Sequence, residues 1–182
     1  VIGEIAQLDE RKNQLKVLEL VPDLVRQYPH IRFFFAGEAR YPEYRRLLEQ
    51  FIHDHHLEEY CILAGFRKDI PAVCAGLDIS VLPSDREGFG RALIETMYMR
   101  VPAIGSDAGG IPEVIDHANC GFVFPLSDFS LLRHYLVRMI EEKELRLSMS
   151  ERSRERVIRL FSAKAYVDNV CRVYEELLEE NV

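Results

Sequence analysis

Glu87 and Glu95 are the two carboxylates of this chain whose spacing is most suggestive of chemistry. Between them lie Gly88 and Gly90, which have no Cβ and therefore let a ligand approach the backbone closely. A buried, apolar run at residues 77–83 precedes this segment, and an apolar helical pattern follows it. A strand, a glycine-containing turn and a helix in that order place both acids at the carboxyl edge of a sheet, where open α/β sheets bind ligands.

The start of the helix after this turn has the chemistry of an anion site. A helix that begins near Gly90 presents unpaired N–H groups from Gly90, Arg91 and Ala92, and these groups and the helix dipole favour a phosphate. Glu95, about one and a half turns into the helix, can accept two hydrogen bonds from a cis-diol such as a ribose. Glu87, in the turn, can accept hydrogen bonds from a second polyol, so the segment fits a nucleotide sugar. Without its flanks, the same spacing is better explained by a turn residue and a solvent-exposed helix residue, because glutamate is common in helices.

Strand-like and helix-like segments alternate along the chain with short connections. Short apolar runs predict strands at residues 1–5, 31–36, 61–64, 78–82, 102–105 and 121–124. Helical spacing of apolar residues predicts helices at residues 12–27, 42–56, 70–75 and 111–115, another after Gly90, and helical structure from about residue 128. This alternation predicts an α/β fold, a Rossmann-like parallel sheet with helices on both faces, as a single domain over residues 1–182.

The composition excludes several classes of protein. Of the 182 residues, 48% are hydrophobic and 29% are charged, as is usual for a globular domain, and the net charge of −7 argues against a general nucleic-acid binder. No apolar run approaches the roughly 20 residues that cross a bilayer. The four cysteines fit neither a zinc site nor a disulfide framework, which predicts reduced thiols and a cytoplasmic location.

Several short motifs around the two glutamates occur in a characteristic order. They are FAGE at residues 35–38, LAGF at 63–66, SDREGFG at 84–90, IETM at 94–97, VPAI at 101–104, GGIPEVI at 109–115 and GF at 121–122. In this order they resemble the C-terminal half of a GT-B glycosyltransferase of the group 1 family (glycosyltransferase family 4). The resemblance covers essentially the whole chain.

That family resemblance implies a retaining transfer of a sugar from a nucleotide donor to an acceptor hydroxyl, in a cleft between two Rossmann-like domains. The C-terminal domain holds the donor, so the resemblance implies that Glu95 binds the ribose diol and that Glu87 is the catalytic-site residue that contacts the sugar hydroxyls. Lys12 would neutralise the diphosphate, which stabilises the leaving group with neither a metal ion nor a cofactor. The resemblance implies further donor contacts from two segments. In the segment after Glu87, Gly88, Phe89 and Gly90 would lie against the sugar and phosphate, and Arg91 and Ala92 would offer backbone N–H groups to the diphosphate. In the segment at residues 66–67, Phe66 and Arg67 would border the base.

Glu4 departs from the pattern of that family. The family commonly has Gly-Arg at the end of the first strand, where this chain has Gly3-Glu4, and a glutamate there would repel a nearby phosphate. Together with RKNQ at residues 11–14, the segment resembles a branch seen among bacterial exopolysaccharide and capsule enzymes. Arg11 is either a replacement for the missing positive charge or a solvated loop cation.

The family's acceptor-binding residues lie in an N-terminal domain. This chain begins inside a strand-like pattern without an initiator Met, so we expect it to be a fragment of a longer two-domain enzyme that binds donor and is inactive alone. A UDP-hexose is the expected donor from family frequency. A lipid-linked or glycan acceptor, with peripheral association at the inner face of the membrane, is what the exopolysaccharide branch implies.

Three alternatives remain open from the sequence. A non-catalytic sugar-nucleotide-binding module with a degraded diphosphate site is the alternative function, whereas a dehydrogenase is disfavoured because no Gly-x-Gly-x-x-Gly follows the first strand. Gly109 and Gly110 fit either a turn before a helix or a glycine loop that lines the cleft. The apolar stripe within residues 162–180 fits either a helix packed on this domain or a helix that faces a neighbouring domain.

Overall fold

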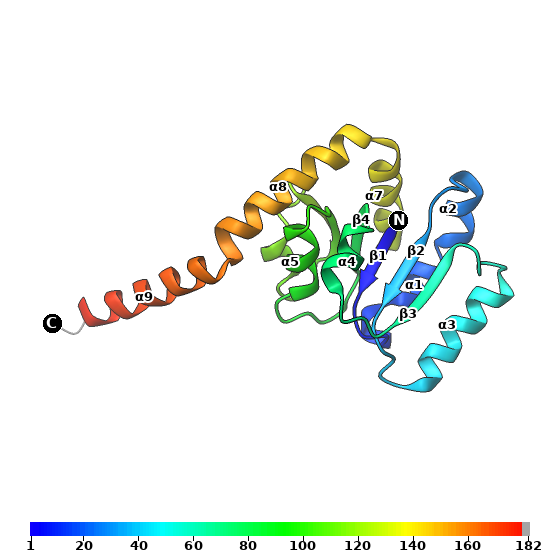
Figure 1. Cartoon of the computed structure of the whole chain (residues 1–182), viewed down its shortest axis with the longest axis horizontal. Helices are drawn as coiled ribbons and strands as arrows, with labels where there is room; N and C mark the ends of the chain where they lie inside the picture. The colour runs from blue at the N-terminus through cyan, green and yellow to red at the C-terminus, as the bar shows by residue number, and fades with distance from the viewer. Residues whose placement is uncertain (180–182) are drawn as a thin grey trace.

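The computed structural model describes residues 1–179 and contains a six-stranded parallel sheet in the order β3-β2-β1-β4-β5-β6 (Figure 1). The strands are β1 (Ile2–Ile5), β2 (Phe33–Ala36), β3 (Cys61–Gly65), β4 (Ile79–Leu82), β5 (Ala103–Ser106) and β6 (Gly121–Phe124). The chain builds outward from β1 to β3 on one side and then crosses back to continue from β4 to β6 on the other. The two central strands, β1 and β4, are therefore neighbours although they are distant in sequence.

Helices connect the strands and continue the chain after the sheet. They are the 3₁₀ turn η1 (Glu10–Lys12), α1 (Gln14–Leu18), α2 (Val21–Gln27), α3 (Pro42–Asp54), α4 (Ile70–Ala75), α5 (Arg91–Tyr98), α6 (Ile111–Val114), α7 (Phe129–Glu141), α8 (Lys143–Phe161) and α9 (Ala163–Glu179). This arrangement confirms the predicted α/β class, and each predicted strand is present within two residues of its expected ends.

Helices cover both faces of the sheet because successive strand residues point to opposite sides. Ile79 and Val81 of β4 belong to a core shared with α1, α2, α3 and α7, whereas Leu82 belongs to a second core with α5, α6 and α8. In β5, Ile104 likewise belongs to the first core and Ala103 to the second. A strand that is buried on both faces has a continuous run of apolar residues, and this is why the sequence predicts these strands.

The single helix predicted at residues 12–27 is wrong. The structure has η1, α1 and α2 there, with Asn13 in the left-handed conformation (φ 58°) and Pro22 in the first turn of α2. Asn tolerates the left-handed region, and proline is accepted in a first helical turn but not in a helix interior. Lys12 consequently lies in a turn at the edge of the sheet rather than on a helix face.

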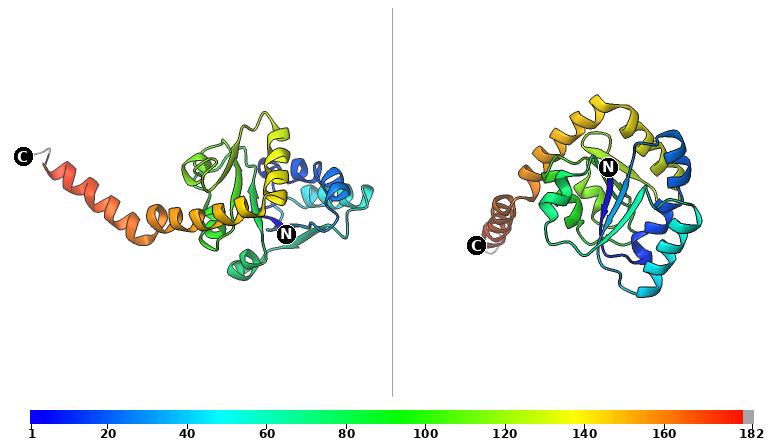
Figure 2. Two further views of the ribbon diagram at one scale, coloured as in Figure 1. Left: turned by 90° about the horizontal axis from the view of Figure 1, so that it is seen from above. Right: turned by 45° about the vertical axis from the view of Figure 1, so that its right-hand side comes forward.

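The last helix, α9, projects away from the sheet in every view (Figures 1 and 2). It buries none of its residues, and Tyr166 and Tyr174 are 70% and 65% exposed. The alternative in which this helix packs on the same domain is therefore wrong for residues 162–179, and residue 180 lies outside the described residues. Within the described chain, no helix has the length and apolarity that crossing a membrane requires.

Because α9 buries no side chain, we expect its removal to leave the rest of the fold intact. A chain that ends at residue 162 should unfold in urea with a free energy within about 0.5 kcal/mol of that of the full chain. As a contrast, Met149→Ala in α8, where the side chain is 1% exposed, should cost about 2–5 kcal/mol. Circular dichroism followed through the urea transition measures both, and a truncation as costly as Met149→Ala would contradict this description of α9.

Candidate functional site

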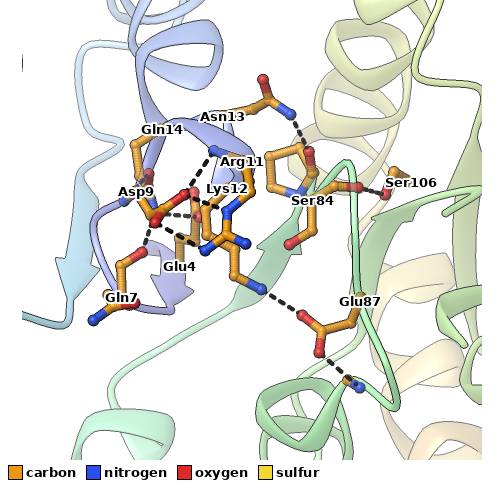
Figure 3. Close-up of polar contacts among 12 residues, drawn as sticks. Glu4, Gln7, Asp9, Arg11, Lys12, Asn13, Gln14, Ser84, Glu87 and Ser106 are labelled. Atoms are coloured by element: carbon orange, nitrogen blue, oxygen red, sulfur yellow. Dashed lines mark hydrogen bonds and ion pairs between the residues drawn. The ribbon is translucent and has the colours of Figure 1, made fainter. Parts of the chain in front are cut away.

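The carboxyl ends of β1 and β4 form the centre of the site. The chain leaves β1 toward β2 on one side, whereas β4 leads to β5 on the other, so the loops after these two strands diverge. Open α/β sheets bind ligands in the crevice at such a reversal of strand order. The crevice here lies between residues 6–13 after β1 and residues 83–90 after β4 (Figure 3).

Two adjoining cavities of about 410 Å³ and about 320 Å³ occupy this crevice. Both are lined by Ile5, Ala6, Gln7 and Arg91, so together they form one trough. The larger cavity is also lined by Ala36, Gly37, Glu38, Phe66, Arg67 and Ile70, and the smaller one by Lys12, Leu82, Glu87, Phe89, Gly90 and Ala92. Every residue predicted for the site lines the trough except Gly88 and Glu95.

Lys12 and Glu87 form an ion pair across the smaller cavity. The Lys12 Nζ lies 2.6 Å from Glu87 Oε2, and the two side chains are only 21% and 18% exposed (Figure 3). The other carboxylate oxygen, Glu87 Oε1, accepts a hydrogen bond of 3.2 Å from the Gly90 N–H. The cation expected at a diphosphate and the acid expected at a sugar therefore bind each other in this structure.

The loops that carry this ion pair are held together on both sides of it. The Asn13 side-chain amide donates to the Pro83 carbonyl at 2.8 Å, and the Asp85 N–H donates to the Arg11 carbonyl at 2.8 Å. These bonds join the two residues that flank Lys12 to the loop after β4, so Lys12 is presented to Glu87 by a braced backbone.

The N-terminus of α5 opens into the same trough. Gly90 precedes the helix with φ 75°, and its carbonyl accepts the N–H groups of Leu93 and Ile94. The N-cap residue Gly90 has no side chain to cap this end, and helix geometry leaves the N–H groups of Arg91 and Ala92 without an intrahelical partner. Backbone donors at a helix start, close to a lysine, are a favourable environment for a phosphate.

Gly109 and Gly110 support the loop that carries Glu87. The Gly110 N–H donates to the Glu87 carbonyl at 3.0 Å, and a Cβ built on Gly109 would lie 1.9 Å from that same carbonyl oxygen. Gly109 also has φ +55°, which disfavours a side chain, and a Cβ on Gly110 would lie 2.6 Å from the Gly88 carbonyl. Of the two alternatives left open, the turn before a helix is confirmed, because these glycines directly precede α6 and line neither cavity of the trough. They also pack closely behind the Glu87 loop.

Two predicted site residues lie beside the trough rather than in its lining. Gly88 is exposed at the tip of the loop, and a Cβ built on it meets nothing within 4 Å. Glu95 is exposed on α5, one turn beyond Arg91, and its charge contributes after burial to raising the pKa of Cys74 in α4 to about 11. Glu95 is therefore close to α4, whose first residue, Ile70, lines the larger cavity.

The expectation that Glu4 faces the phosphate site is wrong. Its side chain is 2% exposed and accepts a hydrogen bond of 2.9 Å from the Gln14 amide beneath the trough. Strand alternation explains the orientation, because the next residue, Ile5, lines the trough from the other side of the strand. Arg11 does not supply the missing charge either, since its guanidinium binds Asp9 at 2.9 and 3.1 Å, which holds the pKa of Asp9 well below its usual range.

Sequence reasoning missed several residues that shape the site. Gln7 and Ala6 line both cavities, and the rule that loops after parallel strands border the crevice would have identified them. Gln14 is fully buried, but a glutamine in the polar run at residues 11–14 gave no signal of that. Within residues 1–179, no cluster of three or more His, Cys, Asp or Glu side chains is placed to hold a metal ion.

Comparison with known proteins identifies similar chains of known class. A family model described as glycosyl transferases group 1 matches residues 1–156. The N-acetyl-alpha-D-glucosaminyl L-malate synthase of Bacillus anthracis is 31% identical over 175 residues, which cover 93% of this chain and 45% of that protein. The putative glycosyltransferase EpsD of Bacillus subtilis (strain 168) is 29% identical over 96% of this chain and 45% of its own length. The chain thus spans about half the length of these relatives.

A solved structure supports the same architecture. HepE of Anabaena, crystallised in complex with UDP and glucose, superimposes with a TM-score of 0.87 at 22% sequence identity. The match covers 96% of this chain and 48% of HepE. At that identity the likeness shows the fold alone.

The close packing of Gly109 predicts a strong asymmetry between two glycine substitutions. Gly109→Ala should cost about 2–4 kcal/mol of unfolding free energy, because the new Cβ adds left-handed strain and a clash with the Glu87 carbonyl. Gly88→Ala is the matched control and should stay within about 0.5 kcal/mol, since its Cβ points into open space. Urea unfolding of both variants tests this, and equal stabilities would refute the bracing role of Gly109.

Proposed function

The chain belongs to the group 1 glycosyltransferase family, and from this premise we propose that it is the donor-binding domain of a retaining glycosyltransferase. The enzyme would transfer a sugar from a nucleotide diphosphate sugar, with UDP as the expected nucleotide, to an acceptor hydroxyl. The observation that carries the proposal is the trough, because it combines a lysine, a helix N-terminus and a carboxylate within one crevice. Retention of configuration is proposed from the family resemblance.

The shape of the trough suggests how a donor would lie in it. Arg91 lines both cavities, so the N–H groups at the start of α5 stand at their junction, where a diphosphate joins nucleoside to sugar. The larger cavity would then take the base beside Phe66 and Arg67, with the ribose toward Glu95. The smaller cavity would take the sugar against the loop that carries Glu87.

The Lys12–Glu87 ion pair gives this binding a chemical consequence. A diphosphate brought to the start of α5 would compete with Glu87 for the Lys12 ammonium group, 2.6 Å away from the carboxylate. Once released, the carboxylate can accept hydrogen bonds from sugar hydroxyls, while Lys12 balances the charge that develops on the leaving diphosphate. These groups of the chain itself supply the positive charge, so we propose catalysis without a metal ion or another cofactor.

The apolar face of α9 suggests where the rest of the enzyme lies. Tyr166, Val173, Tyr174, Leu177 and Leu178 are each at least half exposed along this helix. The relatives are about twice as long as this chain, and we propose that the N-terminal acceptor domain of the same protein covers this face. The charged side chains of α9 are mainly acidic, which disfavours contact with an anionic membrane.

The biological setting is part of the same proposal. We propose a cytoplasmic enzyme of polysaccharide or glycan synthesis, with a glycan or a lipid-linked acceptor at the inner face of the membrane. The two-domain enzyme would be active and this half alone inactive. The alternative of a degraded, non-catalytic module rested on Glu4 as a repulsive charge at the diphosphate, and the burial of Glu4 outside the lining of the trough argues against it.

Nucleotide binding by the chain tests the donor site directly. In calorimetric titrations with UDP, GDP and ADP, at least one nucleotide should bind, and Lys12→Ala and Glu95→Ala should each weaken it by about tenfold or more, that is by about 1.4 kcal/mol. His55→Ala is the control, because His55 stacks on Phe51 at the exposed end of α3. If the folded chain bound none of the three at millimolar concentration, the proposal would fail.

Glu87→Ala should separate the two roles of the ion pair. Removal of the carboxylate frees Lys12, so we expect UDP to bind at least as tightly as to the wild type. The same variant loses the acceptor for sugar hydroxyls, so the affinity of a UDP-sugar relative to that of UDP should fall by about fivefold or more, given about 1 kcal/mol for one hydrogen bond. Equal losses for UDP and for the UDP-sugar would contradict the assignment of Glu87 to the sugar.

A further inference from the structure

Glu4 is a buried acid directly beneath the proposed donor site. It belongs to β1, and the three residues that follow it, Ile5, Ala6 and Gln7, line both cavities of the trough. Its carboxyl group accepts one hydrogen bond through Oε1, whereas Oε2 is buried and has no hydrogen-bond partner. A buried carboxylate with an unpartnered oxygen is strongly disfavoured, so this environment favours the protonated acid.

Gln14 is the residue that holds Glu4, and it is itself fully buried. Its Nε2 donates to Glu4 Oε1 at 2.9 Å and to the Gln7 carbonyl at 3.1 Å. Its Oε1 accepts the Asp9 N–H at 3.3 Å. The Gln14 amide group therefore ties Glu4 to both ends of the segment formed by residues 7–9, which follows β1 at the edge of the trough.

From Asp9 the connection continues to Lys12. The Asp9 carbonyl accepts the Lys12 N–H at 2.8 Å, and the Asp9 carboxylate accepts the Arg11 N–H at 3.0 Å, so Asp9 closes the turn η1. The bonds from Glu4 through Gln14 and Asp9 thus fix the backbone that carries Lys12. Neither Glu4 nor Gln14 lines either cavity of the trough, so any effect on a ligand would pass through this chain of contacts.

The charges around Glu4 agree with a neutral acid. Burial raises the pKa of Glu4 well above its usual value, while Lys12 and the Gln14 hydrogen bond lower it by less. Tyr44 from α3 interacts with Glu4, Glu10 and Asp9, and none of these acidic groups adds a positive charge. The guanidinium groups of Arg11 and Arg40 are paired with the Asp9 carboxylate. A neutral Glu4 also leaves the Lys12 ammonium to Glu87 and to a diphosphate instead of sharing it with a second carboxylate.

We propose that Glu4 and Gln14 form a buried positioning pair for the donor site, in which Glu4 is a neutral carboxylic acid that orients Gln14 and, through Asp9, the turn that carries Lys12. The proposal rests on the proposed function, because it assigns Lys12 to the diphosphate of a bound nucleotide. It also gives the glutamate that departs from the family pattern a specific structural role.

The test compares UDP with UMP, because Lys12 is proposed to act on the diphosphate. In calorimetry, Gln14→Leu should weaken the affinity for UDP by about tenfold, which is about 1.4 kcal/mol. The affinity for UMP should stay that of the wild type. Glu4→Leu should behave in the same way, and the conservative Glu4→Gln, which mimics the protonated acid, should restore UDP affinity. Gln50→Leu is the matched control, since Gln50 is an exposed residue of α3 whose side chain donates to Asp54, away from the trough.

The outcomes separate the two proposals. If the wild type binds UDP and Gln14→Leu binds it equally well, the positioning pair is refuted and the proposed function stands. If Gln14→Leu lost affinity for UDP and for UMP to the same extent, the effect would be a general structural one, and the positioning pair would also be refuted. If the wild type binds no nucleotide, the proposed function fails and the pair loses its role with it.

Two further measurements decide the protonation state if the leucine variants do not fold. In carbon-13 NMR, the Glu4 carboxyl signal should remain that of the protonated acid at neutral pH, and titration at an ordinary glutamate pKa would overturn the proposal. Since the pKa of Glu4 is raised, the folded chain retains a proton that the unfolded chain releases above the ordinary glutamate pKa. The free energy of unfolding of the wild type should therefore fall relative to that of Glu4→Gln as the pH rises from the ordinary glutamate pKa through the raised pKa of Glu4. If the stabilities of the two proteins changed in parallel with pH, the neutral acid would be refuted.

Discussion

The ion pair between Lys12 and Glu87 is the interaction on which the site depends. Its two members are 75 residues apart and meet because β1 and β4 are neighbours where the order of the strands reverses. Each side is fixed independently of the pair itself. Asn13 and Arg11 bond to the loop after β4, whereas Gly109 and Gly110 press on that loop from behind. The backbone thus positions a cation and an anion at hydrogen-bond distance before any ligand arrives.

This arrangement bears on how a charged site can be stable when it is empty. An isolated lysine in a partly buried crevice would be costly, and so would an isolated glutamate, so each compensates for the other. Both side chains retain about a fifth of their exposure, so the pair remains accessible from the crevice. Glu4, below the trough, is stabilised in a different way. It is too deeply buried to exchange partners, and its environment favours the uncharged form. The same chain thus places one glutamate in an ion pair at the surface of the crevice and another in a buried environment beneath it.

Much of the fold was predictable, for identifiable reasons. Strands such as β4 are buried on both faces, so their apolar runs were legible, and Gly90 marked the start of α5. The helix predicted at residues 12–27 was wrong because the apolar spacing continues through a region that Asn13 and Pro22 interrupt. The stripe on α9 was read correctly as a helix face, but an apolar face does not say what covers it. The site residues were found largely through motifs, and those on the loop after β4 lie close together because a single turn carries them.

What the sequence by itself determined is local: the strand, turn and helix around Glu87, the order of the motifs, and hence the family. Only the tertiary structure decided that Lys12 meets Glu87, because that contact requires β1 and β4 to be adjacent. It also decided the environment of Glu4. Along a strand, side chains alternate between faces, so one position separates a residue that lines the trough from one that is buried beneath it. Whether an acid repels a phosphate or supports the site is set by that orientation, which residue type alone does not specify.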